Sequence, residues 1–312
     1  MEILVTGGCG YKGSVLVPKL ISNGHTVTVV DVMWFGNFLP QHPNLNVIQS
    51  DIRDMQTSWF KDIDAIIHLA SVANDPCCEL DPKLTWEISA LATMQLADQA
   101  VKNGIKQFIY ASSSSVYGVS DAPQVTEDTP LNPISEYNKA KMVAERVLLS
   151  YANELIVQIV RPATVCGYSP RMRLDVSVNM LTIQALITGL IMVFGGDQER
   201  PNIHIDDITD LYIFLLENKL PGIFNAGFEN LSILEIAKNI ISLVNAEIKI
   251  TPSNDPRSYR INSDKLLKTG FKPKKCVRDA IQELIAHYKQ GNLKDEDRFY
   301  NIRTMKELFN LI

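Results

Sequence analysis

Tyr137 and Lys141 are the two side chains in this sequence whose types and spacing best suit proton transfer. They lie four residues apart near the start of a predicted helix that runs from Ser135 to about Asn153, so both project from one face of it. A tyrosine with its ordinary pKa of about 10 is a poor base at neutral pH, and a nearby lysine ammonium would favour the phenolate. The same pair also occurs on ordinary solvated helices, so it needs supporting residues.

A run of serines follows the predicted strand Gln107–Ala111 and supplies several hydroxyl groups, within the stretch Ser112–Gly118. Ligands of open parallel sheets bind beyond the carboxyl ends of the strands. A serine hydroxyl at this place could hydrogen-bond a substrate oxygen while a hydride moves. Plain loop chemistry is the alternative explanation of the same residues.

Three glycines, Gly7, Gly10 and Gly13, follow the predicted strand Glu2–Thr6 and open a predicted helix. Glycines let the backbone approach a pyrophosphate, whose charge is stabilised at the positive end of a helix. Asp31 closes the next strand 18 residues after Gly13, which is the context expected of a dinucleotide site. A tight turn without a ligand is the less favoured alternative.

Asp31 determines which dinucleotide we expect. A carboxylate there accepts hydrogen bonds from ribose hydroxyls and repels a 2′-phosphate. Residues 32–36 contain no arginine that could neutralise such a phosphate, so NAD is favoured over NADP. Asp51 and Ile52 follow the third predicted strand and could bracket the adenine, although Asp51 could equally be a helix N-cap.

The elements that position these residues alternate between strand and helix over the first half of the chain. A helix is predicted over Tyr11–Asn23 and another over Pro82–Lys102. Strands separated by such helices indicate a parallel sheet with right-handed crossovers. The expected strands are Glu2–Thr6, Thr26–Asp31, Asn46–Gln49, Ala65–Leu69, Gln107–Ala111 and Glu154–Arg161.

The second half has a looser pattern, with a short strand at Ile191–Phe194 and another at Ile223–Asn225. We therefore predict an α/β protein: a doubly wound Rossmann sheet with a smaller α/β substrate-binding region built from carboxy-terminal segments. Residues 1–165 would form the NAD-binding domain, which also receives segments near 200–228, and residues 166–312 would mainly bind substrate. The predicted helices of this half are Asp206–Asn218, Ser232–Val244 and Val277–Tyr288, with a helical tail in Asp295–Ile312.

Composition narrows the possible partners. The chain has 312 residues, is 46% hydrophobic and has a net charge of −5 without charged blocks, which gives no sign of a nucleic-acid or membrane partner. Its five cysteines lack the spacing of a zinc site or a disulfide framework, so we expect no metal and free thiols in a reducing compartment. A predicted strand that begins at Glu2 leaves no room for a signal peptide, so we expect a cytoplasmic location.

Taken together, these motifs resemble the extended short-chain dehydrogenase/reductases of the nucleotide-sugar epimerase/dehydratase family. They span most of the chain in the order seen in that family. The matching segments are Thr6–Gly13, Asp31, Asp51-Ile52, His68–Ala70, Ser112–Gly118, Tyr137 with Lys141, Arg161–Val165, Arg200–Asp207, Asn225–Gly227 and Asp255–Arg257.

The resemblance implies a role for each matching residue. Tyr137 would be the acid/base, Lys141 its electrostatic partner, and Ser113 the hydroxyl that orients the sugar. The expected cofactor contacts are Gly7, Gly10, Tyr11, Lys12, Gly13, Asp31, Asp51, Ile52, Leu69, Ala70, Tyr137, Lys141, Pro162 and Val165. The expected contacts to a nucleotide-diphosphate sugar are Ser114, Asn179, Arg200 and Arg257.

Two departures from the family pattern bear on the reaction. The dehydratase branch carries Asp and Glu after its catalytic hydroxyl residue, whereas this chain has Ser114 and Ser115, so elimination of water is disfavoured. The loop Ser169–Asp175 resembles members that act on GDP-linked heptoses. Its Arg171 and Arg173 could approach a phosphate or sugar oxygen, or could serve as salt-bridge partners, and both interpretations stay open.

The expected activity is therefore NAD-dependent epimerisation of a nucleotide sugar at C4 through a 4-keto intermediate, in surface-polysaccharide sugar biosynthesis. A 4-dehydrogenase or 4-keto reductase is the alternative, and a non-catalytic NAD-binding protein of the same fold is the competitor from another class. The resemblance also implies a homodimer, because helices matching Pro82–Lys102 and Ser135–Tyr151 pair across a two-fold axis in family members.

Overall fold

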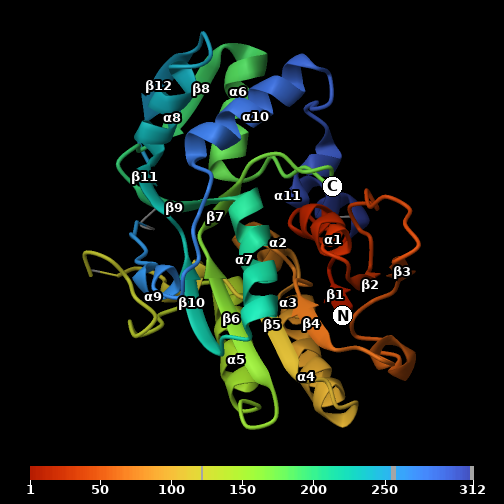
Figure 1. The fold of residues 1–312 in the computed structure, drawn as a ribbon. Helices are drawn as coiled ribbons and strands as arrows, with labels where there is room; N and C mark the ends of the chain where they lie inside the picture. Colours follow the sequence, from red (N-terminus) through yellow and green to blue (C-terminus); the bar gives the residue numbers. More distant parts are fainter. Residues whose placement is uncertain (121, 254–257, 310–312) are drawn as a thin grey trace.

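The computed structural model describes residues 1–120, 122–253 and 258–309. Its centre is a sheet of seven parallel strands, which confirms the predicted α/β fold class (Figure 1). In spatial order the strands are β10 (Gly222–Ala226), β6 (Ile156–Pro162), β5 (Gln107–Ala111), β4 (Ala65–His68), β1 (Glu2–Thr6), β2 (Thr26–Asp31) and β3 (Leu45–Gln49). Strand order reverses between β1 and β4, and a crevice at such a point is where open α/β sheets bind their ligands.

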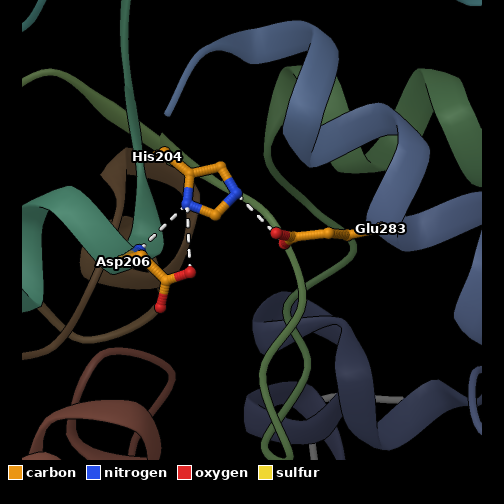
Figure 2. A group of neighbouring side chains, drawn as sticks. All are labelled: His204, Asp206 and Glu283. Atoms are coloured by element: carbon orange, nitrogen blue, oxygen red, sulfur yellow. Dashed lines mark hydrogen bonds and ion pairs between the residues drawn. The ribbon is translucent and has the colours of Figure 1, made fainter. Parts of the chain in front are cut away.

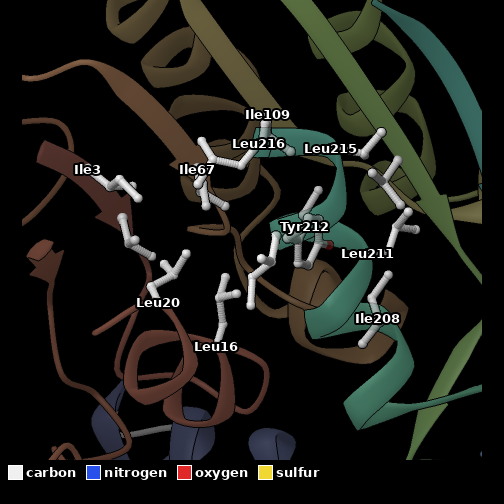
Figure 3. Close-up of a cluster of buried hydrophobic side chains, with 14 of the residues drawn as sticks. Ile3, Leu16, Leu20, Ile67, Ile109, Ile208, Leu211, Tyr212, Leu215 and Leu216 are labelled. Atoms are coloured by element: carbon white, nitrogen blue, oxygen red, sulfur yellow. The ribbon is translucent and has the colours of Figure 1, made fainter. Parts of the chain in front are cut away.

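Helices cover both faces of this sheet. On one face, α1 (Gly13–Ser22) packs beside α7 (Ile205–Asn218). Figure 3 shows the buried side chains between them and the strands, among them Leu16, Leu20 and Ile67. Because both faces are covered, β1, β4 and β5 are buried along almost their whole length and not at alternate residues, and their apolar runs made β1 and β4 recognisable in the sequence.

The other face carries α4 (Ala92–Lys102) and α5 (Glu136–Leu149), with the short helices α2 (Asp75–Leu80) and α3 (Pro82–Trp86) before them. The predicted helix over Pro82–Lys102 is interrupted by a π-helical turn at Glu87–Leu91. Helix α5 begins at the Ser135 N-cap, whose side chain accepts a hydrogen bond from the backbone N–H of Asn138. This cap fixes the start of the helix that carries Tyr137 and Lys141.

The carboxy-terminal half forms a smaller region above the carboxyl ends of the large sheet (Figure 1). Its helices α6 (Ser177–Thr188), α8 (Ile233–Ile241) and α10 (Val277–Lys289) share one apolar core. Its strands are β7 (Thr164–Cys166), β9 (Glu199–His204) and β11 (Glu229–Ser232) in one small sheet, and β8 (Leu190–Phe194) with β12 (Glu247–Thr251) in another. Sequence reasoning missed β7, β9, β11 and β12, because they are short or polar.

Strand β10 and helix α7 belong to the large sheet although they come from residues near 200–228. Short helices α9 (Asp264–Leu267) and α11 (Asn301–Leu308) complete the chain, and α11 lies within the predicted helical tail. We retain the division after residue 165 as a proposal. No helix in the described ranges is long and apolar enough to cross a membrane.

A buried ion pair joins β6 to α5 beneath the serine run. Arg161 Nη2 lies 2.6 Å from Glu145 Oε2, and both side chains are at most 3% exposed. The Ser112 hydroxyl donates to the same carboxylate, and Arg161 Nη1 donates to Tyr117 Oη at 2.8 Å. The pair therefore links β6, α5 and the loop that carries the serines.

We expect Arg161→Leu to lower the free energy of unfolding by about 3–5 kcal/mol, because it leaves Glu145 buried without its charge partner. Urea unfolding followed by circular dichroism measures this. Arg303→Leu is the matched control, since that arginine pairs with Asp297 on the surface and its loss should cost below about 1 kcal/mol. Equal losses in the two variants would show that the buried pair stabilises the fold no more than the surface pair does.

Candidate active site

A large pocket of about 480 Å³ lies at the carboxyl ends of β1, β2, β4 and β5. Its walls come from the glycine turn, the serine run, the start of α5 and the loop after β7. The predicted site residues that line it are Gly7, Gly10, Tyr11, Lys12, Gly13, Asp31, Asp51, Ile52, Leu69, Ala70, Ser113, Ser114, Tyr137, Pro162, Val165 and Arg200. Segments far apart in the sequence thus meet around one space.

The glycine turn is built for close backbone approach. Gly7 has φ +74°, and a Cβ there would lie 2.5 Å from the backbone N of Ala70. A Cβ on Gly13 would lie 2.3 Å from the carbonyl O of Gly8. Both positions exclude a side chain, so the turn presses against the end of β4 and leaves backbone N–H groups at the start of α1 for a phosphate.

Asp31 lies beside this turn with both carboxylate oxygens oriented by the backbone. They accept hydrogen bonds from the Cys9 N–H at 2.9 Å and the Met33 N–H at 2.7 Å. Burial raises the pKa of Asp31, while these two bonds and the charge of Arg171 oppose the rise. Each oxygen keeps a lone pair for a ribose hydroxyl, so the residues present fit a dinucleotide.

Asp51 caps a turn and not a helix, because the next helix begins only at Thr57. Its carboxylate accepts the backbone N–H of Arg53 at 2.8 Å and pairs with the Arg53 guanidinium at 2.9 Å, which is the behaviour of a local cap. The Arg53 hydrogen bond holds the pKa of Asp51 below its ordinary value, although burial acts in the opposite direction. Asp51 nevertheless lines the pocket, together with Ile52.

Tyr137 and Lys141 lie on one face of α5, as their spacing predicts. The Lys141 ammonium is 6.0 Å from the Tyr137 ring centroid and 4.8 Å from that of Tyr110, and it donates to the Ala111 carbonyl at 2.8 Å. Burial, reinforced by the charge of Lys12, lowers the pKa of Lys141 to about 7. Burial raises the pKa of Tyr137, whereas the charge of Arg173 acts to lower it.

Ser113 is oriented by its neighbours. Ser115 Oγ donates to Asn138 Oδ1 at 2.5 Å, so its own hydrogen is committed there and Ser113 Oγ donates to Ser115 Oγ at 2.7 Å. This arrangement leaves the Ser113 oxygen as an acceptor toward the pocket. Ser114 instead bonds the Tyr259 hydroxyl at 2.9 Å.

Asn179 does not reach the pocket lining. Its Oδ1 accepts from the Gly167 N–H at 3.0 Å, and its Nδ2 donates to Tyr11 Oη and to the Arg173 carbonyl. The buried amide has thus found partners that orient Tyr11 and the loop after β7, which spacing could not reveal. Arg257, the other residue expected to contact the diphosphate, lies outside the described residues.

The two arginines of the loop after β7 both line the pocket, and both also have protein partners. Arg173 Nε bonds Asp175 at 2.7 Å. Arg171 is buried over the Phe35 ring at 4.0 Å and bonds Asn301 Oδ1 at 2.6 Å. Sequence reasoning found no arginine within residues 32–36, yet the fold brings Arg171 onto Phe35 from elsewhere. The preference for NAD therefore depends on Asp31 and not on a missing arginine.

One histidine–carboxylate group among the described residues has metal-ligand chemistry: His204, Asp206 and Glu283 (Figure 2). His204 Nδ1 accepts the backbone N–H of Asp206 at 3.0 Å, so Nε2 carries the hydrogen that is donated to Glu283 at 3.0 Å. Lys19 and Lys275 neutralise the two carboxylates. These bonds cap α7 and join it to α10, which accounts for the group without an ion.

The sheet, the glycine turn and the Tyr/Lys pair define a short-chain dehydrogenase/reductase type of dinucleotide enzyme. A family model described as "NAD dependent epimerase/dehydratase family" matches residues 3–227, and the chain belongs to this family. Its cofactor is NAD, as predicted.

Individual relatives cover almost the whole chain. UDP-glucose 4-epimerase of Lactobacillus helveticus is 27% identical over 92% of this chain and 95% of its own length. UDP-glucuronic acid decarboxylase 1 of Danio rerio is 29% identical over 92% of this chain and 72% of its own. Among solved structures, UDP-glucuronic acid 4-epimerase from Bacillus cereus, in complex with UDP-glucuronic acid and NAD, superposes with a TM-score of 0.82 at 26% identity, covering 93% of this chain and 99% of the other.

The lowered pKa of Lys141 gives a stability test of the site. Between about pH 7 and 10 the unfolded chain binds a proton at this lysine that the folded chain does not, so the wild-type free energy of unfolding rises with pH there. Lys141→Met removes this dependence. We expect the wild type to gain roughly 1–2 kcal/mol over the variant between pH 7.5 and 9 in urea unfolding without added NAD. Lys139→Met removes an exposed lysine of the same helix, and its free energy of unfolding should depend on pH as that of the wild type does. The assignment would be contradicted if the free energy of unfolding of Lys141→Met rose with pH as steeply as that of the wild type.

Proposed function

We propose that this protein epimerises a nucleotide-diphosphate sugar at C4 through a 4-keto intermediate. The observation that carries the proposal is the single pocket in which the dinucleotide residues Gly7–Gly13 and Asp31 meet Ser113 and Tyr137. The relatives support it, since epimerases recur among them by name.

In the proposed reaction Tyr137 removes the proton of the C4 hydroxyl. NAD⁺, when bound, supplies a hydride acceptor. Lys141, when protonated, stabilises the phenolate electrostatically from the same face of α5, and Ser113 offers its oxygen to a sugar hydroxyl because its own hydrogen is directed to Ser115. Return of the hydride to the opposite face of the rotated sugar, with return of the proton from Tyr137 to the C4 oxygen, would complete epimerisation.

Elimination of water is disfavoured by the side chains beside Ser113. Ser114 bonds Tyr259 and Ser115 bonds Asn138, so the two positions that would need a carboxylic acid and a carboxylate hold hydroxyls already engaged with the protein. The same pocket would support net 4-oxidation or 4-keto reduction, and a GDP-heptose-like substrate stays a prediction.

At the substrate end, Arg200 lines the pocket with Tyr259, and Arg173 lines it near Tyr137. Guanidinium groups suit a diphosphate because they bind its oxygens in pairs. We propose these arginines as diphosphate contacts, in place of the buried Asn179. A place in surface-polysaccharide biosynthesis and a cytoplasmic location remain part of the proposal, and the five free cysteines favour the latter.

Tyr137→Phe tests the proposed base. We expect turnover to fall by about 10²–10⁴-fold while NAD binding is retained, because only the proton-transfer group is lost. The assay incubates UDP-, GDP-, dTDP- and CDP-sugars with and without NAD⁺ and measures products and deuterium exchange at C4. Tyr151→Phe is the control, since that hydroxyl bonds Asp98 away from the pocket. Unchanged turnover in Tyr137→Phe would show that another group is the base, and no exchange on any sugar would favour a non-catalytic NAD-binding protein.

A homodimer belongs to the same proposal. Leu91 is 47% exposed on the helix expected to pair across the two-fold axis, so an apolar side chain is available there. Light scattering should give about twice the chain mass of 34.9 kDa, and Leu91→Lys should shift the protein toward monomer. A monomeric wild type would contradict the homodimer without affecting the proposed chemistry.

A further inference from the structure

Arg171 combines three properties that a role as a salt-bridge partner, one of its two expected roles, does not explain. It is 2% exposed, it lines the NAD pocket, and its Nε is a buried donor without a partner among the described residues. A buried donor left unsatisfied costs about 1–3 kcal/mol, so such a group in a ligand pocket indicates an acceptor supplied by the ligand.

The guanidinium is held in place from two distant parts of the chain. Phe35, on the loop that follows Asp31, packs against its plane at 4.0 Å. Asn301 Oδ1, at the start of α11, accepts a hydrogen bond from Nη2 at 2.6 Å, and the Met172 carbonyl accepts one from Nη1 at 3.3 Å. Each terminal nitrogen therefore has one protein acceptor, whereas the buried Nε has none among the described residues.

The carboxy-terminal segment 297–308 is itself hydrogen-bonded to the loop after β7. The Leu174 N–H donates to the Phe299 carbonyl at 2.8 Å, and the Asn301 N–H donates to Asp175 Oδ2 at 3.0 Å. Asp175 also bonds Arg173 and Asn74, both of which line the pocket. The segment, the loop and the start of α2 are therefore connected along one wall of the pocket.

We propose that Arg171 is an NAD-binding residue whose Nε donates to an oxygen of the adenosine-diphosphate half, and that segment 297–308 holds it there and slows release of the cofactor. Asp31, the expected ribose ligand, is close enough to act on the Arg171 charge, which locates Arg171 at that half of the site. The family match ends at residue 227, so this fastening comes from a part of the chain outside the match.

The proposal depends on NAD binding in this pocket and not on the sugar chemistry, so its test contains no sugar. Protein freed of bound nucleotide is titrated with NAD by calorimetry, and release is followed by stopped-flow fluorescence. We expect Arg171→Met to raise the Kd about ten- to a hundredfold, the loss expected of one charge-assisted hydrogen bond, with a smaller rise for Arg171→Lys. Asn301→Ala should speed release several-fold, because it frees the guanidinium.

Arg303→Ala is the matched control, since this arginine of α11 bonds Asp297 within the segment and does not line the pocket. It should bind and release NAD as the wild type does. If Arg171→Met fails to fold, Arg171→Lys and Asn301→Ala decide the question. Wild-type Kd and release rates in these variants, with only the free energy of unfolding lowered, would overturn the proposal and make the bonds purely structural.

Hydrogen exchange supplies a readout that a structural role would not change. NAD should slow amide exchange in segment 297–308 of the wild type, and should do so less in Asn301→Ala. Exchange in this segment that is indifferent to NAD would also overturn the proposal. Failure of the proposed epimerisation would leave both measurements unaffected.

Discussion

Burial of the Lys141 ammonium is the constraint around which this site is arranged. A cation transferred from water into a protein interior loses favourable hydration, and here one carbonyl, that of Ala111, and the face of Tyr110 replace it. That replacement is incomplete, as the lowered pKa shows. An anion beside the lysine therefore gains stability, and the Tyr137 phenol, one turn away on the same helix, is a pocket-lining group that can become one. In the proposed reaction, the charge of this lysine would offset part of the rise that burial imposes on the pKa of Tyr137.

The same constraint explains why the surroundings of α5 are so strongly fixed. Lys141 can reach the Ala111 carbonyl at the end of β5 only if α5 has one particular position along that strand. The Ser135 cap sets where the helix begins, and the buried Arg161–Glu145 pair sets how it packs on β6. Because Ser112 bonds the same carboxylate, the serine run is positioned with the helix and not independently of it. The proposed catalytic serine on this loop is in this way held by a helix and a strand.

Features that depend on residues close together in the sequence were predicted, and features that depend on distant residues were not. Seven parallel strands and the Tyr137/Lys141 face follow from local patterns, namely apolar runs, caps and a four-residue spacing, and these were recoverable. The strands β7, β9, β11 and β12 carry no such pattern, because small sheets at an edge need no continuous apolar run. Asn179 shows another limit: its type suited a diphosphate, but its hydrogen-bonding capacity is taken up by Tyr11, Gly167 and the Arg173 carbonyl once the loop folds.

The contacts of Arg171 could not have been predicted, since they join positions 136 and 130 residues away from it in the chain. No spacing rule connects Phe35, Arg171 and Asn301; only the fold does. This separation has a consequence for how the protein works. The proton-transfer groups lie within the matched family region, whereas the fastening at Asn301 lies beyond it, so the hold on the cofactor and the chemistry performed with it are set by different parts of the chain. A change in segment 297–308 can therefore alter how long NAD stays bound without moving Tyr137 or Lys141.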